Sequence, residues 1–218
     1  MKKYELTRET KVIDGVELHR IKALNSFGNI KKGELGGWIE SEKNLSQDGY
    51  AWVGENATVR GNATVCENAT VRGNAIICGN ATVHGSAIVR GFATVSNNAA
   101  VYGNAWVDGH ATVGDNAKVY ENANVFENAR VGGDGKVRGN AWICGDATVR
   151  GKEDFIVFKN WWSSGRYFTW TRSNNKWSVG CFYGSGEELI AKAYKDSEKS
   201  GREYERVVKY VESILKEE

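Results

Sequence analysis

The sequence contains no proline, a single methionine and four cysteines among its 218 residues, and its formal net charge is only +2. That charge is too small to predict binding to a nucleic-acid polymer by bulk electrostatics. No apolar run approaches the ~18 residues of a membrane span, and the opening residues lack the apolar stretch of a signal peptide. We therefore expect a soluble, intracellular protein without a membrane partner.

The composition is equally unusual in what it does contain. Glycine occurs 26 times, Asn-Ala pairs are abundant, and the apolar fraction of 41% argues against a disordered chain. An aliphatic residue recurs at every sixth position from Val53 to Val149, seventeen times without a miss. Two positions before each lies an alanine, replaced once by Gly135. Regular repetition is therefore the main signal in the sequence.

A period of six predicts a three-sided coil. Residues two apart on a strand share a face, so the alanine and the aliphatic residue of each unit point inward and their neighbours point outward. The Gly/Glu-Asn pair that follows forms a corner, where we expect asparagine to adopt the left-handed conformation. Three such sides close a triangle of eighteen residues, so residues eighteen apart lie in one surface column.

This unit resembles the hexapeptide repeat of left-handed parallel β-helix proteins, in which an aliphatic residue is followed four positions later by a small one. The resemblance covers roughly half of the chain and implies the left-handed winding. The predicted fold is mainly β: a left-handed parallel β-helix of about 5–6 coils with caps at its ends. Leu35–Glu40, followed by Ala51–Val53, resembles the opening segment of hexapeptide proteins common in phages and prophages, which implies the cytoplasm of a bacterial host cell.

We expect the β-helix to occupy residues 51–151 and to be flanked by two different domains. Residues 1–50 form an N-terminal cap, with a hairpin at Lys11–Leu18 that turns at Asp-Gly, and then an irregular opening coil. Residues 152–218 form an aromatic-rich α+β domain of about three antiparallel strands, with one turn at Ser173–Lys176. Two helices follow, each expected to begin with a capping box. The two boxes are Ser185 with Glu188 and Ser200 with Glu203.

One outer face of the predicted prism carries large apolar side chains. It contains Trp52, Ile88, Trp106, Phe126 and Trp142, which is too much apolar surface for a solvated wall. Hexapeptide relatives are commonly trimers packed through their prisms, so the resemblance implies a homo-oligomer, with a trimer favoured. The alternative is that a terminal segment of the same chain covers this face.

A second outer face gathers aromatic and basic side chains that could hold a planar anionic ligand by stacking and charge. The candidates there are His84, Tyr102, Lys118, Tyr120, Lys136 and Arg138. A simpler interpretation is a solvated face whose charges are balanced by Glu67 and Glu121. The C-terminal domain adds Trp161, Trp162, Arg166 and Arg172, which are binding anchors or parts of a small aromatic core. Adjacent tryptophans cannot share one side of a regular strand, so one of them should reach a surface.

The sequence is compatible with three functions. The first is a non-catalytic, oligomeric binding protein for a small anionic ligand, in a concrete version a phage anti-defence protein that sequesters a host nucleotide signal. The second is a structural or assembly module for protein partners. The third is a hexapeptide-type acyl-CoA-dependent acyltransferase with His84 as general base, although no acidic residue obviously orients it. Cys66, Cys78 and Cys144 fall on three different faces and lack metal-ligand spacing, so we expect neither a metal nor a cofactor.

Overall fold

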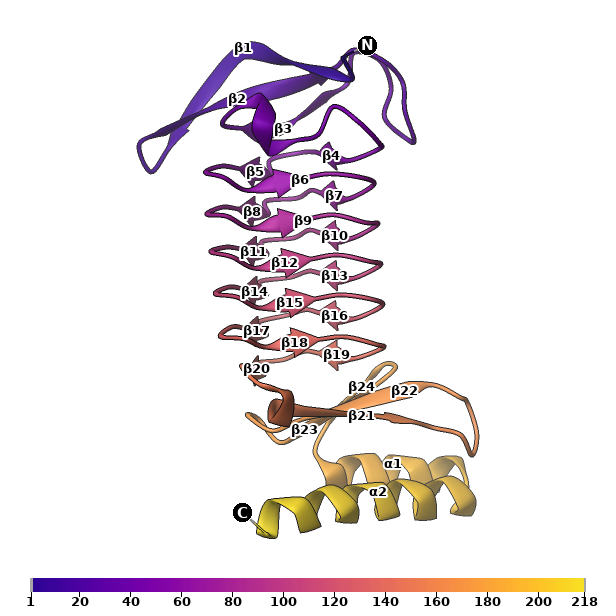
Figure 1. The fold of residues 1–218 in the computed structure, drawn as a ribbon. Coiled ribbons are helices and arrows are strands. Elements are labelled where there is room, and N and C mark those ends of the chain that lie inside the picture. Colours follow the sequence, from indigo (N-terminus) through magenta and orange to yellow (C-terminus); the bar gives the residue numbers. More distant parts are fainter. Residues whose placement is uncertain (1, 218) are drawn as a thin grey trace.

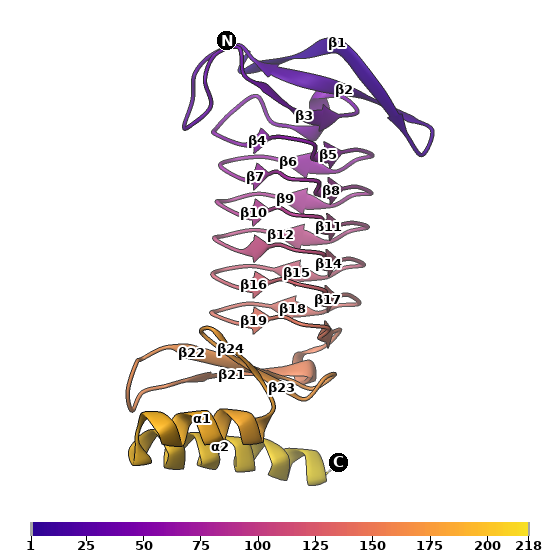
Figure 2. The ribbon, with the colours of Figure 1, turned by 180° about the vertical axis from the view of Figure 1, so that it is seen from behind.

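A computed structural model describes residues 2–217 as three parts that follow one another along a single axis (Figures 1 and 2). An N-terminal antiparallel sheet lies at one end, a three-sided parallel β-helix forms the middle, and a small sheet with two helices closes the other end. In Figure 1 the near strands run from left to right while the coils descend, so the winding is left-handed. The predicted fold class is therefore confirmed.

The β-helix consists of two-residue strands that stack in register into three parallel sheets. The first sheet, which we call the tryptophan face, comprises β4 (Trp52–Val53), β7 (Thr70–Val71), β10 (Ile88–Val89), β13 (Trp106–Val107), β16 (Asn124–Val125) and β19 (Trp142–Ile143). The second, the threonine face, comprises β5 (Thr58–Val59), β8 (Ile76–Ile77), β11 (Thr94–Val95), β14 (Thr112–Val113), β17 (Arg130–Val131) and β20 (Thr148–Val149). The third, the tyrosine face, comprises β6 (Thr64–Val65), β9 (Thr82–Val83), β12 (Ala100–Val101), β15 (Lys118–Val119) and β18 (Lys136–Val137).

Each strand pairs with the strand eighteen residues away. Trp106 lies opposite Asn124, and Asn124 lies opposite Trp142, as the six-residue period predicts. The aliphatic residue of every unit is at most 1% exposed, and so are all of the repeat alanines. The columns of outward side chains derived from the sequence are therefore confirmed.

The corners differ from the prediction. The left-handed residue is the one that precedes the asparagine, usually a glycine or an acidic residue, and not the asparagine itself. The asparagine side chains instead bond to one another from coil to coil: Asn62 Nδ2 donates to Asn80 Oδ1 at 3.1 Å, and Asn80 Nδ2 donates to Asn98 Oδ1 at 3.0 Å. The asparagine is therefore selected at this position for a hydrogen-bonded ladder along the prism edge.

Five corners place an acidic residue in the left-handed region, where a side chain is normally strained. Each carboxylate accepts the backbone N–H of the glycine one coil further on, as Glu67 does from Gly85 at 2.8 Å and Glu121 from Gly139 at 2.7 Å. A hydrogen bond to an ionised acceptor is stronger than one between neutral groups. It therefore offsets part of the backbone strain. The five residues are Glu55, Glu67, Asp115, Glu121 and Glu127.

The N-terminal end is covered as predicted. Strands β1 (Tyr4–Ile13) and β2 (Val16–Ala23) form a hairpin whose Asp-Gly turn has positive φ at both residues. Strand β3 (Leu35–Ile39) pairs antiparallel with β2 and parallel with β5, so it begins the first coil. The short helix η1 (Glu42–Asn44) and a bridge from Leu45 to Val65 complete that coil.

The C-terminal end has four antiparallel strands rather than the expected three. After the short helix η2 (Lys152–Asp154), these are β21 (Phe155–Lys159), β22 (Tyr167–Thr171), β23 (Lys176–Val179) and β24 (Phe182–Gly184). The segment after the Ser173–Lys176 turn is divided by a second turn, in which Gly180 adopts positive φ. The two strands that it joins pair with each other.

Helices α1 (Gly186–Asp196) and α2 (Glu198–Lys216) pack their apolar sides against this sheet. The capping box of Ser185 with Glu188 is confirmed. The second box is wrong: Ser197 caps α2 by accepting the N–H of Ser200, which is itself inside the helix. Both serines can cap a helix, because each has a hydroxyl that accepts a backbone N–H. The backbone between the two helices places Ser197, and not Ser200, at the N-cap position of α2.

Candidate functional site

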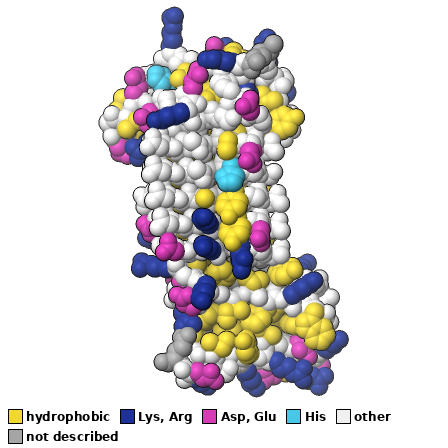
Figure 3. Space-filling view, viewed as in Figure 1, with side chains coloured by type: hydrophobic (Ala, Val, Ile, Leu, Met, Phe, Trp, Pro, Cys, Tyr) yellow, Lys and Arg dark blue, Asp and Glu magenta, His cyan; other side chains and the backbone are white. Residues whose placement is uncertain are grey.

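The tyrosine face carries a continuous ladder of rings. The imidazole of His84 stacks on Tyr102 with centroids 4.9 Å apart and planes 3° from parallel, and Tyr102 stacks on Tyr120 at 5.0 Å. Figure 3 shows this column on the near face of the prism, with Lys and Arg side chains beside its lower part. Stacked coils repeat every ~4.8 Å, so side chains in one column are held at stacking distance by the backbone.

A groove opens where this ladder meets the C-terminal sheet. Its volume is about 820 Å³. The prism contributes Tyr120, Lys136 and Arg138, and the C-terminal part contributes Lys152 and Tyr167. Phe155, Val157, Glu121, Gly139 and Asn140 complete the lining. The groove therefore joins aromatic surface to cations from two separate parts of the chain.

The charge of this groove is positive. Three of its side chains are cationic at neutral pH, and Glu121 is the only carboxylate among the described residues that line it. One oxygen of that carboxylate already accepts the N–H of Gly139. Burial raises the pKa of the Tyr102 phenol beside it, with Tyr120 and Glu121 adding to the shift, so this phenol stays neutral. An anion that enters the groove would therefore meet more hydrogen-bond donors than hydrogen-bond acceptors.

The ten residues named from the sequence as ligand candidates divide into separate places. Six lie on the tyrosine face, three of them in the groove: His84, Tyr102, Lys118, Tyr120, Lys136 and Arg138. Trp161 is 73% exposed, whereas Trp162 is buried against Tyr204. This confirms that only one of the adjacent tryptophans faces the core.

The two arginines of the C-terminal part that were named as ligand candidates also lie apart from the groove lining. Arg166 lines a smaller cavity of about 260 Å³ beside α1 and α2. The Nε of Arg172 donates to the carbonyl of Glu153. Conversely, Lys152 and Tyr167 belong to the groove and were not predicted. No local signal marks them, because their position against the prism depends on how the C-terminal sheet packs.

The expectation about His84 needs a correction. Glu67 Oε1 lies 3.8 Å from Nδ1 of His84, so an acid does stand beside this ring, contrary to the sequence-based expectation. It comes from the corner one coil earlier. The other histidine of the prism, His110, follows the left-handed Gly109, and its ring stacks on Phe92 at 4.9 Å.

The two ends of the chain cover part of the tryptophan face. Phe27 of the N-terminal cap packs edge-to-face on Trp52 at 5.5 Å, leaving that indole 4% exposed. At the other end the thiol of Cys144 is buried beside Ser178 of the C-terminal sheet. Thus the chain's own ends cover part of this face, while Trp106 and Trp142 remain 43% and 38% exposed.

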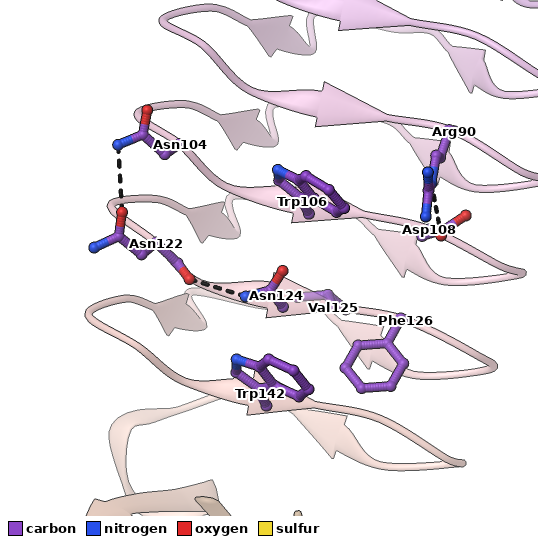
Figure 4. Close-up of a pocket in the computed structure, with 9 residues that line it drawn as sticks. All are labelled: Arg90, Asn104, Trp106, Asp108, Asn122, Asn124, Val125, Phe126 and Trp142. Atoms are coloured by element: carbon purple, nitrogen blue, oxygen red, sulfur yellow. Dashed lines mark hydrogen bonds and ion pairs between the residues drawn. The ribbon is translucent and has the colours of Figure 1, made fainter. Parts of the chain in front are cut away.

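Between these two indoles lies a cavity of about 510 Å³ (Figure 4). The Nε of Arg90 bonds to Asp108 Oδ2 at 2.8 Å on its upper side. Its guanidinium carbon lies 5.2 Å from the Trp106 ring centroid. Phe126 meets Trp142 edge-to-face at 5.7 Å on the lower side. Asn104, Asn122, Asn124 and Val125 form the remaining wall.

Within residues 2–217, no group of three or more His, Cys, Asp or Glu side chains is arranged to hold a metal ion. The three prism cysteines lie on three different faces, as predicted from the period. No helix in the same part of the chain has the length and apolar character needed to cross a membrane.

Comparison with known proteins gives one local match. Residues 75–91 match the family model described as the YdcK beta solenoid repeat. The match spans β8, β9 and β10, which make up nearly one full coil. No curated protein matches the chain. The chain thus contains a β-solenoid repeat, and this likeness extends to the repeat alone.

Proposed function

We propose that this protein is a non-catalytic binding protein that captures a small anionic ligand in the groove of the tyrosine face. The observation that carries the proposal is the convergence of Lys136, Arg138 and Lys152 on one cavity beside exposed aromatic surface. Two of these cations come from the last tyrosine-face coil and one from the segment that follows the prism. Such convergence from separate segments differs from the scattered charge of an ordinary solvated wall.

The groove offers both contacts that a nucleotide needs. A guanidinium such as that of Arg138 bonds two oxygens of a phosphate at once, and lysines add point charges. Tyr120 ends the ring ladder, since Tyr102 is the only ring stacked on it within residues 2–217, and a base can stack on such a ring. This supports a nucleotide as the anionic ligand, and sequestration of a host nucleotide signal by a phage protein is the specific form of the proposal.

The groove favours binding over catalysis. Neither histidine nor cysteine is among the described residues that line it, and its single carboxylate is engaged by Gly139. A general base needs a free acceptor within hydrogen-bond reach of the proton that it removes, and a carboxylate that already accepts a hydrogen bond is a weaker base. We therefore expect a bound ligand to leave the groove chemically unchanged.

The test compares two single variants. Arg138→Gln removes a cation from the groove, and Arg130→Gln removes one from the threonine face of the same prism. With ATP as the probe in isothermal titration calorimetry, we expect the first variant to weaken binding by about tenfold or more, because a charged hydrogen bond contributes ~1.5–3 kcal/mol. The control should bind like the original protein. Equal binding by all three proteins, or equal losses in both variants, contradicts the proposal.

Native mass spectrometry of protein purified from its host adds an independent reading. It reports co-purified anions and the oligomeric state together, and we propose a homo-oligomer, with a trimer favoured. Release of the ligand intact after denaturation separates capture from turnover. A ligand recovered as a converted product contradicts a non-catalytic role.

The acyltransferase alternative rests on the contact between His84 and Glu67 at 3.8 Å. Against it, one face of the imidazole is covered by Tyr102. The alternative predicts consumption of acetyl-CoA that disappears in His84→Gln. The assembly alternative rests on the exposure of Trp106 and predicts a defined oligomer that Trp106→Ala disrupts.

A further inference from the structure

The tryptophan face contains an interrupted ring ladder. On the tyrosine face three consecutive coils each present a ring, so His84, Tyr102 and Tyr120 stack without a gap. On the tryptophan face Trp106 and Trp142 occupy equivalent positions two coils apart, and Asn124 occupies the coil between them. The middle rung of this column therefore has no ring, and the cavity of about 510 Å³ lies there.

Trp106 lies above the missing rung (Figure 4). The guanidinium of Arg90, from the coil above, lies over this indole with its central carbon 5.2 Å from the ring centroid. Asp108 holds that guanidinium in place and neutralises its charge. In Figure 4 Trp142 has the same orientation as Trp106 and lies directly below it. The two indoles therefore form the roof and the floor of a slot.

The spacing of the slot leaves room for one ring. Two coil repeats separate the indoles by about 9.6 Å. On the tyrosine face the same two repeats separate His84 from Tyr120, and the single ring of Tyr102 stacks on both. A puckered pyranose also fits between two such walls, because its axial hydrogens project above and below the ring. The polar groups at the rim then decide between a bare aromatic ring and a hydroxylated ring.

The rim of the slot suits hydroxyl groups. The amides of Asn104 and Asn122 stand along one edge, the amide of Asn124 lies between the indoles, and the carboxylate of Asp108 stands at the opposite edge (Figure 4). Neutral sugars are held by such planar polar groups around an apolar floor, which combine orientation with desolvation. The pairing of Arg90 with Asp108 leaves no net charge in the lining. An uncharged ligand is thus favoured here, in contrast to the groove of the tyrosine face.

We propose that this slot binds one hexopyranose ring of a neutral sugar, sandwiched between Trp106 and Trp142 with its hydroxyls toward the rim. A β-D-glucosyl unit fits best, because all of its ring substituents are equatorial and both of its faces expose C–H groups. A galactosyl unit carries an axial hydroxyl on one face, which would bring a polar group against an indole. The site is separate from the anionic groove and does not depend on it.

The decisive variant fills the missing rung. Asn124→Phe places a ring between the two indoles, as Tyr102 lies between His84 and Tyr120, and removes neither wall. Trp142→Ala removes the floor. Trp161→Ala is the control, because this indole is 73% exposed and lies in the C-terminal part of the chain. Circular dichroism of each variant establishes that the β-helix is intact.

Binding is measured by saturation-transfer-difference NMR and titration with methyl β-D-glucopyranoside, methyl β-D-galactopyranoside and cellobiose. We expect the glucoside and cellobiose to bind and the galactoside to bind more weakly. Both site variants should lose affinity by at least about tenfold, whereas the control stays within roughly twofold of the original protein. Saturation should reach protons on both faces of the glucose ring.

Three results overturn the proposal: no binding of either glucoside to the original protein, undiminished binding to Asn124→Phe, or an equal loss in the control. Sedimentation velocity of the same proteins can give a fourth result that overturns the proposal. If the original protein self-associates and Asn124→Phe abolishes that association without affecting sugar binding, then the slot is an interface between copies of this chain. Failure of this site leaves the ATP titration of the Arg138 groove unaffected, so the two proposals can be distinguished.

Discussion

Alanine substitutions at two glycines in equivalent corners distinguish the cost of backbone strain from the cost of disturbing the stacked coils. Gly85 and Gly139 have φ of +69° and +68°, and each donates its N–H to a glutamate one coil earlier, at 2.8 and 2.7 Å. They differ in what lies beneath them. A Cβ on Gly85 would lie 2.7 Å from the backbone nitrogen of Gly103, whereas a Cβ on Gly139 would meet nothing closer than a carboxylate oxygen of Glu121 at 3.9 Å.

The expected costs follow from these distances. Alanine in the left-handed region costs about 1 kcal/mol at either position. At Gly85 the new methyl also forces the next coil to move, which adds ~1 kcal/mol at the low end of the range for overpacking. The low end applies because Glu67, one coil earlier, tolerates a Cβ by adopting a φ of 59°. Gly85→Ala should therefore cost roughly twice as much free energy of unfolding as Gly139→Ala.

Urea denaturation followed by circular dichroism measures both variants, and thermal melts provide a second reading. For a domain of this size each kcal/mol corresponds to about 2–4 °C, so the midpoints of the two variants should differ by about that interval. Equal destabilisation would refute the reasoning, because it would mean that stacking of the coils adds no steric constraint at this corner. A larger effect at Gly139 would refute it as well.

Two further predictions concern titratable groups. Burial raises the pKa of the Cys144 thiol to about 11, so at pH 8 iodoacetamide should modify the exposed Cys181 first and Cys144 only upon unfolding; equal labelling rates by mass spectrometry contradict this. Burial lowers the pKa of the Lys3 ammonium from 10.5 to about 8, so between these values the unfolded chain binds a proton that the folded chain does not. The free energy of unfolding should therefore rise with pH across this window, and Lys3→Met should remove that rise in denaturation curves at pH 7.5 and 9.5.

The inward faces and the columns of the repeat are predictable from the sequence. A strict six-residue period fixes which side chains point inward, and adding eighteen fixes which of them share a column. The columns of His84 with Tyr102 and of Trp106 with Trp142 therefore follow from residue numbers alone. Each coil contacts mainly its two neighbours. The period of the sequence therefore also determines which residues of neighbouring coils lie side by side.

The corners show where pattern alone fails. Asparagine and the residue before it are both compatible with a turn, and sequence preference assigns the left-handed conformation to the asparagine. The structure assigns it to the preceding residue, because this frees the asparagine side chain to bond from Asn62 to Asn80 and onward along the edge. That choice depends on contacts between coils, which a single repeat does not contain.

The surfaces that suggest function depended on packing between distant segments. The period placed Tyr120 and Arg138 in one column, but only the docking of the C-terminal sheet brought Lys152 and Tyr167 beside them. In the same way, only the N-terminal cap decided that Trp52 is covered while Trp106 stays open. A repeat encodes its own stacking in every unit, whereas the path of a non-repeating end is set by long-range contacts that occur once and leave no periodic trace.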